Sequence, residues 1–495
     1  MKIILLLTIL SIQINILAQN TSSKNPYQPV KDALQSLKLD KDLKNAAISF
    51  LAIEIKTGKT IAALNPDMGM IPASTQKLFT TATVLELSGP DYRFKTKIQY
   101  SGTIDTLTKK LNGSIIIKGG GDPTLGSKYF YKGKQFDFIK SIISAIKNLG
   151  IKQITGSIIA DASIYPYMPA SPKWLWEEVG NYYAVAAGGI AIYDNLYELH
   201  FKSPPQAGMP TKIIKIYPQI PNLTIQNQVL SSNIRSDEAY IYGAPYTYER
   251  IVRGTIPKNK SNFIVKGAMP DPAYFLSQKI QQQLDSAGIH CQKPATSIRL
   301  IKLNKQKLPD KALTFKIIYS PKLIDIINLT NKKSNNLYAE HLLNLTALKR
   351  NLKDKSQSAS AQEIKYFWLQ KGMDIAGLHL VDGSGLSRLN SISAKQFVFL
   401  LKYMKTQSKY SQAFINTLPV AGQSGTLKYF GRNTILSGNM TAKSGSVERV
   451  RAFAGYLKTK SGKEIAFSIN IANYNCSYRS LKQKITNLLI SLAGI

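Results

Sequence analysis

The sequence predicts an α/β (α+β) protein made of several domains. Three observations support this prediction. The chain has 495 residues, which is too long for one typical domain. Its first and last parts mix amphipathic helices with apolar strands, whereas short strands and turns dominate from about Tyr92 to residue 300. The hydrophobic content of 44% suits a globular protein with a full core.

The first 18 residues predict export. Met1-Lys2 is followed by the apolar run Ile3 to Leu10, and the segment ends on the small residue Ala18. A short basic start, a brief apolar core and a small final residue are typical of a secretory signal that is removed from the mature protein. A retained N-terminal membrane anchor is the alternative. We therefore expect the protein in the periplasm or cell envelope.

The formal net charge is +35, and the basic residues are spread along the whole chain. Such a field favours peripheral association with an anionic surface such as a cell envelope. No recognition helix, zinc finger or aromatic RNA-binding signature is visible, so nucleic acid is not expected as a partner. The four histidines are scattered, and we expect no metal and no other cofactor. Whether Cys291 and Cys476 form a disulfide stays open.

The first hundred residues predict a helix, a hairpin and a second helix. Residues 30–43 have helical spacing, and strands 47–55 and 60–64 flank a four-residue turn. Apolar residues from Leu78 to Leu85 then recur at helical spacing. Ser88-Gly89-Pro90 ends that helix.

The middle of the chain predicts short strands with a few helices. Two carboxylates, Glu177 and Glu178, follow two tryptophans. Adjacent carboxylates do not converge on one point, which favours a binding role or plain surface over acid–base chemistry. Residues 201–263 are rich in Pro, Tyr and Asn and predict a small β-rich module. The other predicted elements are a strand at 111–118, a helix at 136–149, a strand at 153–161 and a helix at 275–287.

After residue 300 the pattern of longer helices and apolar strands returns. We expect helices at 321–330, 337–348 and 480–492, strands at 450–457 and 464–472, a polar loop at 353–360, and dense turns at 382–388 and 418–422.

Three short motifs carry the chemistry: Ser74-x-x-Lys77, Ser334-Asn335-Asn336 and Lys443-Ser444-Gly445. Positions i and i+3 share one face of a helix, so the Lys77 amine can take a proton from the Ser74 hydroxyl. Asn336 would fix the Lys77 amine and hold the substrate backbone, and Ser334 would pass a proton between the lysines and the leaving nitrogen.

The third motif is expected to bind the substrate. Lys443 and Ser444 offer a cation and a hydroxyl to a C-terminal carboxylate. The strand predicted to begin there, through Gly445 and Ser446, could pair with the substrate as an added strand. Backbone N–H groups of Ser74 and Ser446 would form an oxyanion hole. Each motif alone has a structural alternative, because the second could be a helix N-cap and the third a simple turn.

The three motifs in this order mark class A β-lactamases and penicillin-binding proteins. The chain resembles the class C low-molecular-mass penicillin-binding proteins, the D-alanyl-D-alanine carboxypeptidase/endopeptidase group, over nearly all of its mature length. Besides Pro72 to Lys77 and the second motif with Leu337, the resemblance rests on Gly89 to Phe94, Gly120 to Leu125, Asp382 to Arg388 and Leu418 to Gly422.

The resemblance implies a serine transpeptidase/β-lactamase-like catalytic domain interrupted by two nested, mainly β inserted domains. The 260 positions from Ser74 to Ser334 leave room for both. We expect a signal peptide at 1–18, the catalytic domain at 19–95 and 299–495, inserted domain II at 96–200 and 264–298, and the nested β-rich domain III at 201–263.

The resemblance also implies an enzyme that removes terminal D-alanine from peptidoglycan stem peptides and cuts cross-links through an acyl-Ser74 intermediate, with β-lactam antibiotics as inhibitors. Two residues depart from the family pattern. Ser444 replaces the usual threonine, and Glu178 replaces an aspartate that in some members meets the free amino end of a diamino acid. The alternatives are a serine β-lactamase, for which no deacylating glutamate motif is obvious, and a catalytically silent wall-binding protein.

Overall fold

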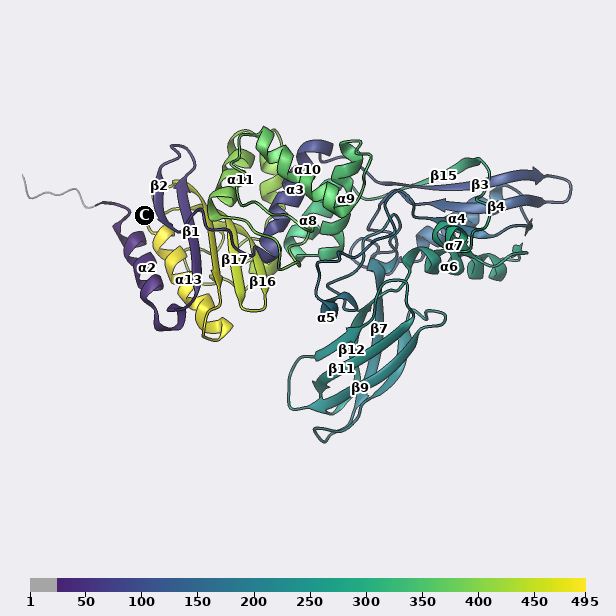
Figure 1. The fold of residues 1–495 in the computed structure, drawn as a ribbon, viewed down its shortest axis with the longest axis horizontal. Coiled ribbons are helices and arrows are strands. Elements are labelled where there is room, and N and C mark those ends of the chain that lie inside the picture. The colour runs from purple at the N-terminus through teal and green to yellow at the C-terminus, as the bar shows by residue number, and fades with distance from the viewer. Residues whose placement is uncertain (1–24) are drawn as a thin grey trace, which may run out of the picture.

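The computed structural model describes residues 25–495, so the predicted signal segment lies outside the described residues. Figure 1 shows three bodies: helices around a sheet at the left, a second sheet with helices at the right, and a β body below them. The predicted mixed α/β class is confirmed.

The left-hand body is built on one antiparallel sheet with the strand order β16-β17-β18-β1-β2. Its strands are β1 (Ala47–Glu54), β2 (Thr60–Leu64), β16 (Met440–Val447), β17 (Val450–Lys458) and β18 (Glu464–Ala472). Strand β1 lies beside β18, with Ala47 opposite Ala472. The two ends of the described chain therefore form a single domain, and β16 lies at the edge of its sheet.

Helices cover both faces of this sheet (Figure 1). The two helices that pack together on one face are α2 (Gln28–Leu39) and α13 (Tyr478–Ala493). The remaining helices of the body are α3 (Lys77–Ser88), α8 (Leu323–Lys333), α9 (Asn336–Lys349), α10 (Gln357–Gln370), α11 (Ala394–Thr406) and α12 (Ser411–Asn416). Because it is covered on both sides, β18 is buried continuously from Ile465 to Ile471.

Helix α3 lies in the centre of the helical layer, and every residue from Lys77 to Leu85 is buried. Phe79 packs edge-on against Trp368 and Phe397, with ring centroids 6.0 and 5.5 Å away. Gly89 ends the helix with a φ of 73°, a conformation that glycine adopts without strain. The predicted helix and its end are confirmed.

The right-hand body is a seven-stranded sheet with three helices. Its strands are β3 (Lys95–Asp105), β4 (Lys110–Lys118), β5 (Gln153–Ile154), β6 (Ile158–Asp161), β13 (His290–Cys291), β14 (Thr296–Ser297) and β15 (Ala312–Tyr319). Its helices are α4 (Asp137–Asn148), α6 (Pro272–Ser286) and α7 (Ile298–Leu303). Strand β15 pairs with β3, so this sheet continues past the boundary predicted at residue 298.

The single strand predicted at 153–161 is two strands, β5 and β6, and that prediction is wrong in this respect. The interruption falls at Gly156, whose N–H donates to the Gly113 carbonyl at 2.8 Å. A Cβ at position 156 would lie 2.5 Å from that oxygen. The two backbone segments lie so close together at this point that a residue with a side chain could not continue the strand.

The lower body contains two three-stranded sheets, in the orders β12-β7-β8 and β10-β11-β9. Its strands are β7 (Leu196–Ser203), β8 (Lys212–Tyr217), β9 (Thr224–Ser232), β10 (Glu238–Tyr242), β11 (Glu249–Pro257) and β12 (Lys260–Ala268). The predicted β-rich module is therefore present, but limits at 201 and 263 would cut β7 and β12. We propose that domain III spans residues 196–268, and that domain II comprises 95–195 and 269–319.

Two smaller predictions are wrong in part. The polar segment 353–360 is a loop only as far as Ser356, which caps α10 by accepting a hydrogen bond from the Ala359 N–H at 3.1 Å. Its polar residues mark a helix start. The helix predicted from Pro321 begins at Leu323.

Cys291 and Cys476 are both free. Among residues 25–495, every helix is too short or too polar to span a bilayer.

Candidate active site

Ser74 and Lys77 are joined by a hydrogen bond where α3 begins. A short 3₁₀-helix, η2 (Ala73–Gln76), runs directly into α3. The Lys77 Nζ atom lies 2.8 Å from the Ser74 Oγ atom. Lys77 is completely buried, whereas Ser74 is half-buried. The predicted contact between positions i and i+3 is confirmed.

Ser334-Asn335-Asn336 connects α8 to α9, as the sequence predicts. Ser334 has a φ of 56° and ends α8 in the left-handed conformation. The Asn335 side chain caps α9 by accepting a hydrogen bond from the Tyr338 N–H at 3.1 Å. The N-cap alternative is therefore correct for this one residue. It leaves Asn336 free to accept a hydrogen bond from Lys77 Nζ at 2.7 Å.

Lys443 points from β16 toward the second motif. Its Nζ atom donates to Ser334 Oγ at 3.0 Å and to the Ser444 carbonyl at 2.7 Å. The third motif was expected at the start of a strand, and this is wrong, because β16 begins at Met440 and the motif lies in its middle. The simple-turn alternative is wrong for the same reason. The Ser444 hydroxyl donates to Thr426 Oγ1 at 2.7 Å.

Gly445 allows β16 to lie against the turn that carries Ser74. A Cβ at position 445 would lie 2.6 Å from the Pro72 carbonyl and 3.1 Å from the Ser74 nitrogen. A larger residue would push the strand away from the nucleophile candidate. Ser446 follows on the strand and is exposed. The structure thus brings all three motifs to one place.

Burial changes the proton affinity of both lysines. It lowers the pKa of Lys77 to about 7, against the opposing effect of the Glu340 and Asp382 carboxylates. Burial also lowers the pKa of Lys443 well below its ordinary value, and the nearby Lys77 charge lowers it further. A buried amine with a lowered pKa can be neutral and can take a proton.

Two contributors to the site were not identified from the sequence. The Ser384 carbonyl accepts a third hydrogen bond from Lys77 Nζ, at 2.7 Å. The fully buried Glu340 carboxylate accepts the N–H groups of Gly383 and Ser384 at 2.8 to 3.1 Å, which holds this turn in place. The dense turn predicted at 382–388 could have indicated such a buried partner, because the many backbone N–H groups of a turn require hydrogen-bond acceptors.

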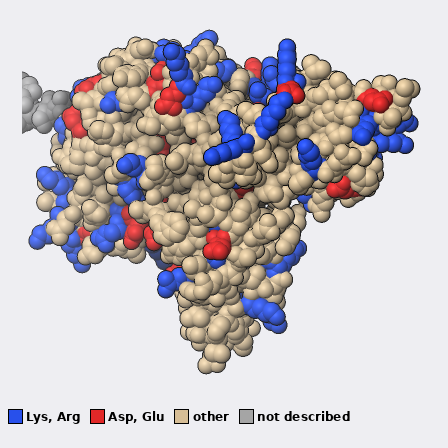
Figure 2. Space-filling view, turned by 45° about the vertical axis from the view of Figure 1, so that its right-hand side comes forward, with Lys and Arg blue, Asp and Glu red and all other residues tan. Residues whose placement is uncertain are grey.

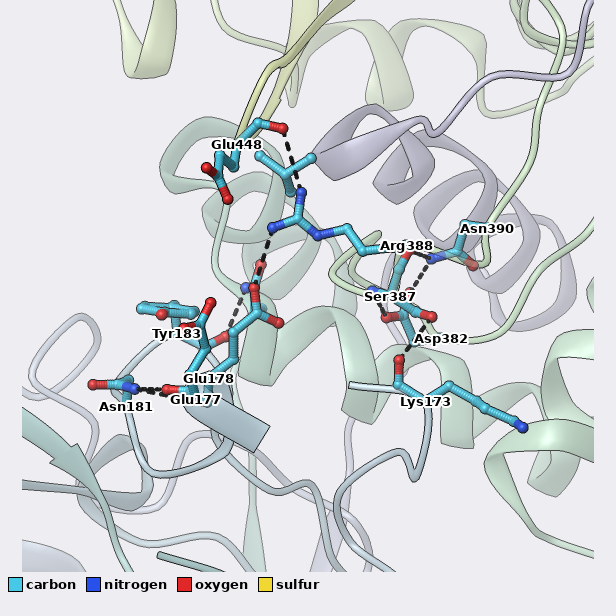
Figure 3. A network of polar contacts seen from close by, with 12 residues as sticks. Lys173, Glu177, Glu178, Asn181, Tyr183, Asp382, Ser387, Arg388, Asn390 and Glu448 are labelled. Atoms are coloured by element: carbon cyan, nitrogen blue, oxygen red, sulfur yellow. Dashed lines mark hydrogen bonds and ion pairs between the residues drawn. The ribbon is translucent and has the colours of Figure 1, made fainter. Parts of the chain in front are cut away.

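Glu178 lies on the short helix α5 (Trp176–Val179) and faces the left-hand body, which carries the three motifs and is called the catalytic body below. Its Oε1 atom lies 3.5 Å from Arg388 Nη2, and Arg388 Nη1 donates to the Glu448 carbonyl at 3.4 Å (Figure 3). Glu178 is only 6% exposed. Within the described part of the chain, Glu178 Oε2 and Arg388 Nε have no hydrogen-bond partner. Arg388 as a partner of Glu178 was missed, because 210 positions separate the two residues in sequence.

A cavity of about 460 Å³ connects these groups. It is open to the surface between the catalytic body and α5. Its lining includes Ser74, Glu177, Glu178, Tyr183, Tyr240, Asn336, Gly385, Leu386, Arg388 and Ser446 to Glu448. Ser74, Asn336 and Glu178 therefore face one cleft, and the buried Lys77 contacts both Ser74 and Asn336. Among residues 25–495, no group of three or more His, Cys, Asp or Glu side chains is placed to bind a metal ion.

Comparison with known proteins identifies relatives that match nearly the whole chain. The D-alanyl-D-alanine carboxypeptidase DacB of Haemophilus influenzae is 26% identical over 451 residues, which cover 88% of each chain. The crystal structure of penicillin-binding protein 4 (dacB) from the same organism superposes with a TM-score of 0.80 at 24% identity, and covers 94% of this chain and 99% of that one. A second structure of that protein, complexed with a β-lactam, has a TM-score of 0.76 at the same identity and coverage.

Residues 30–491 match the family described as D-Ala-D-Ala carboxypeptidase 3 (S13), which is nearly the whole chain. The chain belongs to this family, and it is a serine-type D-alanyl-D-alanine carboxypeptidase.

Proposed function

We propose that the enzyme removes the terminal D-alanine of peptidoglycan stem peptides by forming an acyl intermediate on Ser74. The observation that carries this proposal is the 2.8 Å contact between Ser74 Oγ and the fully buried Lys77 Nζ. A serine hydroxyl becomes an effective nucleophile when an adjacent base takes its proton. The lowered pKa of Lys77, about 7, suits that role near neutral pH.

In the first step, neutral Lys77 takes the Ser74 proton while Oγ attacks the penultimate D-alanine carbonyl. The negative charge that develops on the carbonyl oxygen would be stabilised by the backbone N–H groups of Ser74 and Ser446. A proton then passes to the nitrogen of the leaving D-alanine through Ser334, whose hydroxyl contacts Lys443 Nζ at 3.0 Å. Water subsequently hydrolyses the acyl-Ser74 ester and regenerates the enzyme.

The third motif would hold the substrate during this reaction. Lys443 and Ser444 supply a cation and a hydroxyl for the terminal carboxylate. Strand β16 is the edge strand of its sheet, so a peptide can pair with its free side through Gly445 and Ser446. Ser444 stands where the family usually has threonine. Its hydroxyl donates to Thr426 Oγ1 at 2.7 Å, so Thr426 adds a second hydroxyl at this place.

We further propose that the enzyme cuts peptide cross-links, is acylated by β-lactam antibiotics, and works in the cell envelope. The cavity beside Ser74 is open, which suits a branched cross-linked substrate. The solved relative with a bound β-lactam supports the second proposal. Lys and Arg side chains lie spread over the face shown in Figure 2 rather than in one patch, and the formal charge of +35 favours an anionic surface.

The reaction is tested by digesting purified muropeptides and reading the products by mass. We expect monomeric pentapeptides to lose one alanine residue and cross-linked dimers to be converted to monomers. Enzyme treated beforehand with penicillin provides the matched control and should release neither product. If the penicillin-treated enzyme released the same products as the untreated enzyme, the proposal would be contradicted.

Glu178 is proposed to recognise the free amino end of the diamino acid in the stem. Its Oε2 atom is buried and has no partner in residues 25–495, while Arg388 Nε beside it is also free in that range. An ammonium would pair with Oε2, and a neighbouring carboxylate would pair with the guanidinium. Burial raises the pKa of Glu178 in spite of the Arg388 charge. A cationic group from the substrate would lower this pKa and favour the ionised carboxylate.

Glu178→Gln is expected to lower kcat/KM about 10- to 100-fold for stem peptides with a free amino group, which is the loss of one hydrogen bond between charged groups. Peptides whose amino group is acetylated should be cleaved equally by both enzymes. Glu177→Gln is the matched control, since Glu177 is the exposed neighbour, and should change either rate less than about threefold. An equal loss on both substrates in Glu178→Gln would refute amino recognition.

A further inference from the structure

We propose that a second cavity, on the other side of α5, binds a sugar ring of the glycan strand to which the stem peptide is attached. This inference rests on the proposed peptidoglycan substrate and deepens it. The cavity has a volume of about 350 Å³. Its lining consists of residues 167–172, Trp174, Trp176, Val179, Ala244, Pro245 and Tyr246.

Helix α5 separates the two cavities. Glu177 and Glu178 line the cleft that contains Ser74, whereas Trp176 and Val179 line the second cavity. Residues i and i+3 share a face of a helix, so Trp176 and Val179 form one side of α5 and the two carboxylates lie on another. A helix with its side chains is about 10 Å across. Three extended peptide residues span about 10 Å, so a stem bound beside Ser74 is long enough to reach the other side.

The chemistry of the lining fits a neutral sugar. It contains two tryptophans and two tyrosines but no charged side chain. Trp176 is 60% exposed and Met168, which lines the same cavity, is 64% exposed, so the cavity presents an exposed apolar patch of the kind that marks binding sites. Pyranose rings present a face of C–H groups that packs on an aromatic ring, and hydroxyls that need polar partners. Tyr167 lines the cavity, and its buried hydroxyl has no hydrogen-bond partner among the described residues, so a small movement of this side chain would give a sugar hydroxyl a partner.

Two of the aromatic side chains in the cavity wall, Trp174 and Tyr246, are held in place by polar contacts. Trp174 Nε1 donates to Asp382 Oδ2 at 2.8 Å, which ties the wall to the turn beside Lys77. The Arg299 guanidinium lies 4.1 Å from the centre of the Tyr246 ring and pairs with Asp271 at 2.7 Å. A preorganised surface of this kind loses little conformational entropy when a ligand binds. An apolar peptide or a second copy of the chain would gain less from the single unpartnered hydroxyl and the shallow aromatic surface than a sugar would.

The test compares two substrates that differ only in the sugar. We expect the disaccharide pentapeptide to have a kcat/KM about tenfold higher than the same pentapeptide without sugar, which is the upper range for one aromatic contact. Trp176→Ala should bring this ratio close to one without changing cleavage of the free pentapeptide, and Trp176→Phe should keep part of the preference. Tyr366→Ala, on the outer face of α10 and 49% exposed, is the matched control and should leave the ratio unchanged.

An unchanged ratio in Trp176→Ala, or an equal loss on both substrates, would overturn the sugar site while the proposed peptidase function stands. Loss of a concentration-dependent dimer in this variant, with the ratio unchanged, would assign the surface to a second copy and would also overturn it. If the wild-type enzyme cleaves neither substrate, the proposed function fails and binding is measured directly. Quenching of tryptophan fluorescence by tetra-N-acetylchitotetraose in wild type but not in Trp176→Ala would then support the site, and its absence would overturn it.

Discussion

Ser74→Ala is expected to lower kcat/KM for stem peptides by about 10⁴-fold or more, because the residue provides the only proposed covalent attachment for the acyl group. Covalent labelling by fluorescent penicillin should disappear completely in the same variant. Mass spectrometry of the wild-type enzyme after labelling should place the added mass on the peptide that contains Ser74. The variant should fold normally, since the hydroxyl makes one contact at the edge of a cavity.

Ser163→Ala is the control for this experiment, because Ser163 is exposed in a turn of the inserted domain and should leave labelling unchanged. Persistent labelling of Ser74→Ala at wild-type stoichiometry would mean that another residue is acylated. Fast turnover of a chromogenic β-lactam by the wild-type enzyme, in place of slow stoichiometric labelling, would favour the β-lactamase alternative. Normal stem-peptide binding with no labelling of wild type would favour the catalytically silent wall-binding protein.

Lys77→Met is expected to reduce the acylation rate by about 10³-fold, since it removes the proposed base and leaves the nucleophile in place. Lys77→Arg should be similarly impaired although it retains a positive charge, because a guanidinium stays protonated and cannot accept the Ser74 proton. This pair of variants separates a need for a base from a need for a cation. Wild-type activity in Lys77→Arg would contradict the role proposed for Lys77. Cooperative thermal unfolding of each variant checks that the fold is intact.

The pH dependence of wild type tests the same residue. Burial lowers the pKa of Lys77 to about 7. The neutral amine is the reactive form, so kcat/KM should fall about tenfold for each unit of pH below 7 and should level off above it. The residual activity of Lys77→Met should lack this limb. A wild-type profile that keeps rising toward pH 10 would mean that the lysine titrates at its ordinary value, and it would contradict the lowered pKa of Lys77.

The sequence alone was sufficient to predict the three motifs, their order and most of the elements that carry them. Ser74 and Lys77 are three positions apart in one continuous helical segment, η2 followed by α3, so their contact follows from local geometry. The connection at Ser334 and the two C-terminal strands also follow from local patterns of apolar and turn-forming residues. Hydrophobic periodicity predicts helices and strands from residues that are close in sequence. The contact, the connection and the strands depend only on such residues.

Only the tertiary structure decided which distant groups surround those motifs. The support of the 382–384 turn by Glu340 spans more than 40 positions, and the pairing of Glu178 with Arg388 links an inserted domain to the catalytic one. The sequence also did not predict the position of Lys443 inside β16 or the aromatic cavity beside α5. These features arise where separate elements pack against one another, and no local periodicity encodes which surfaces meet.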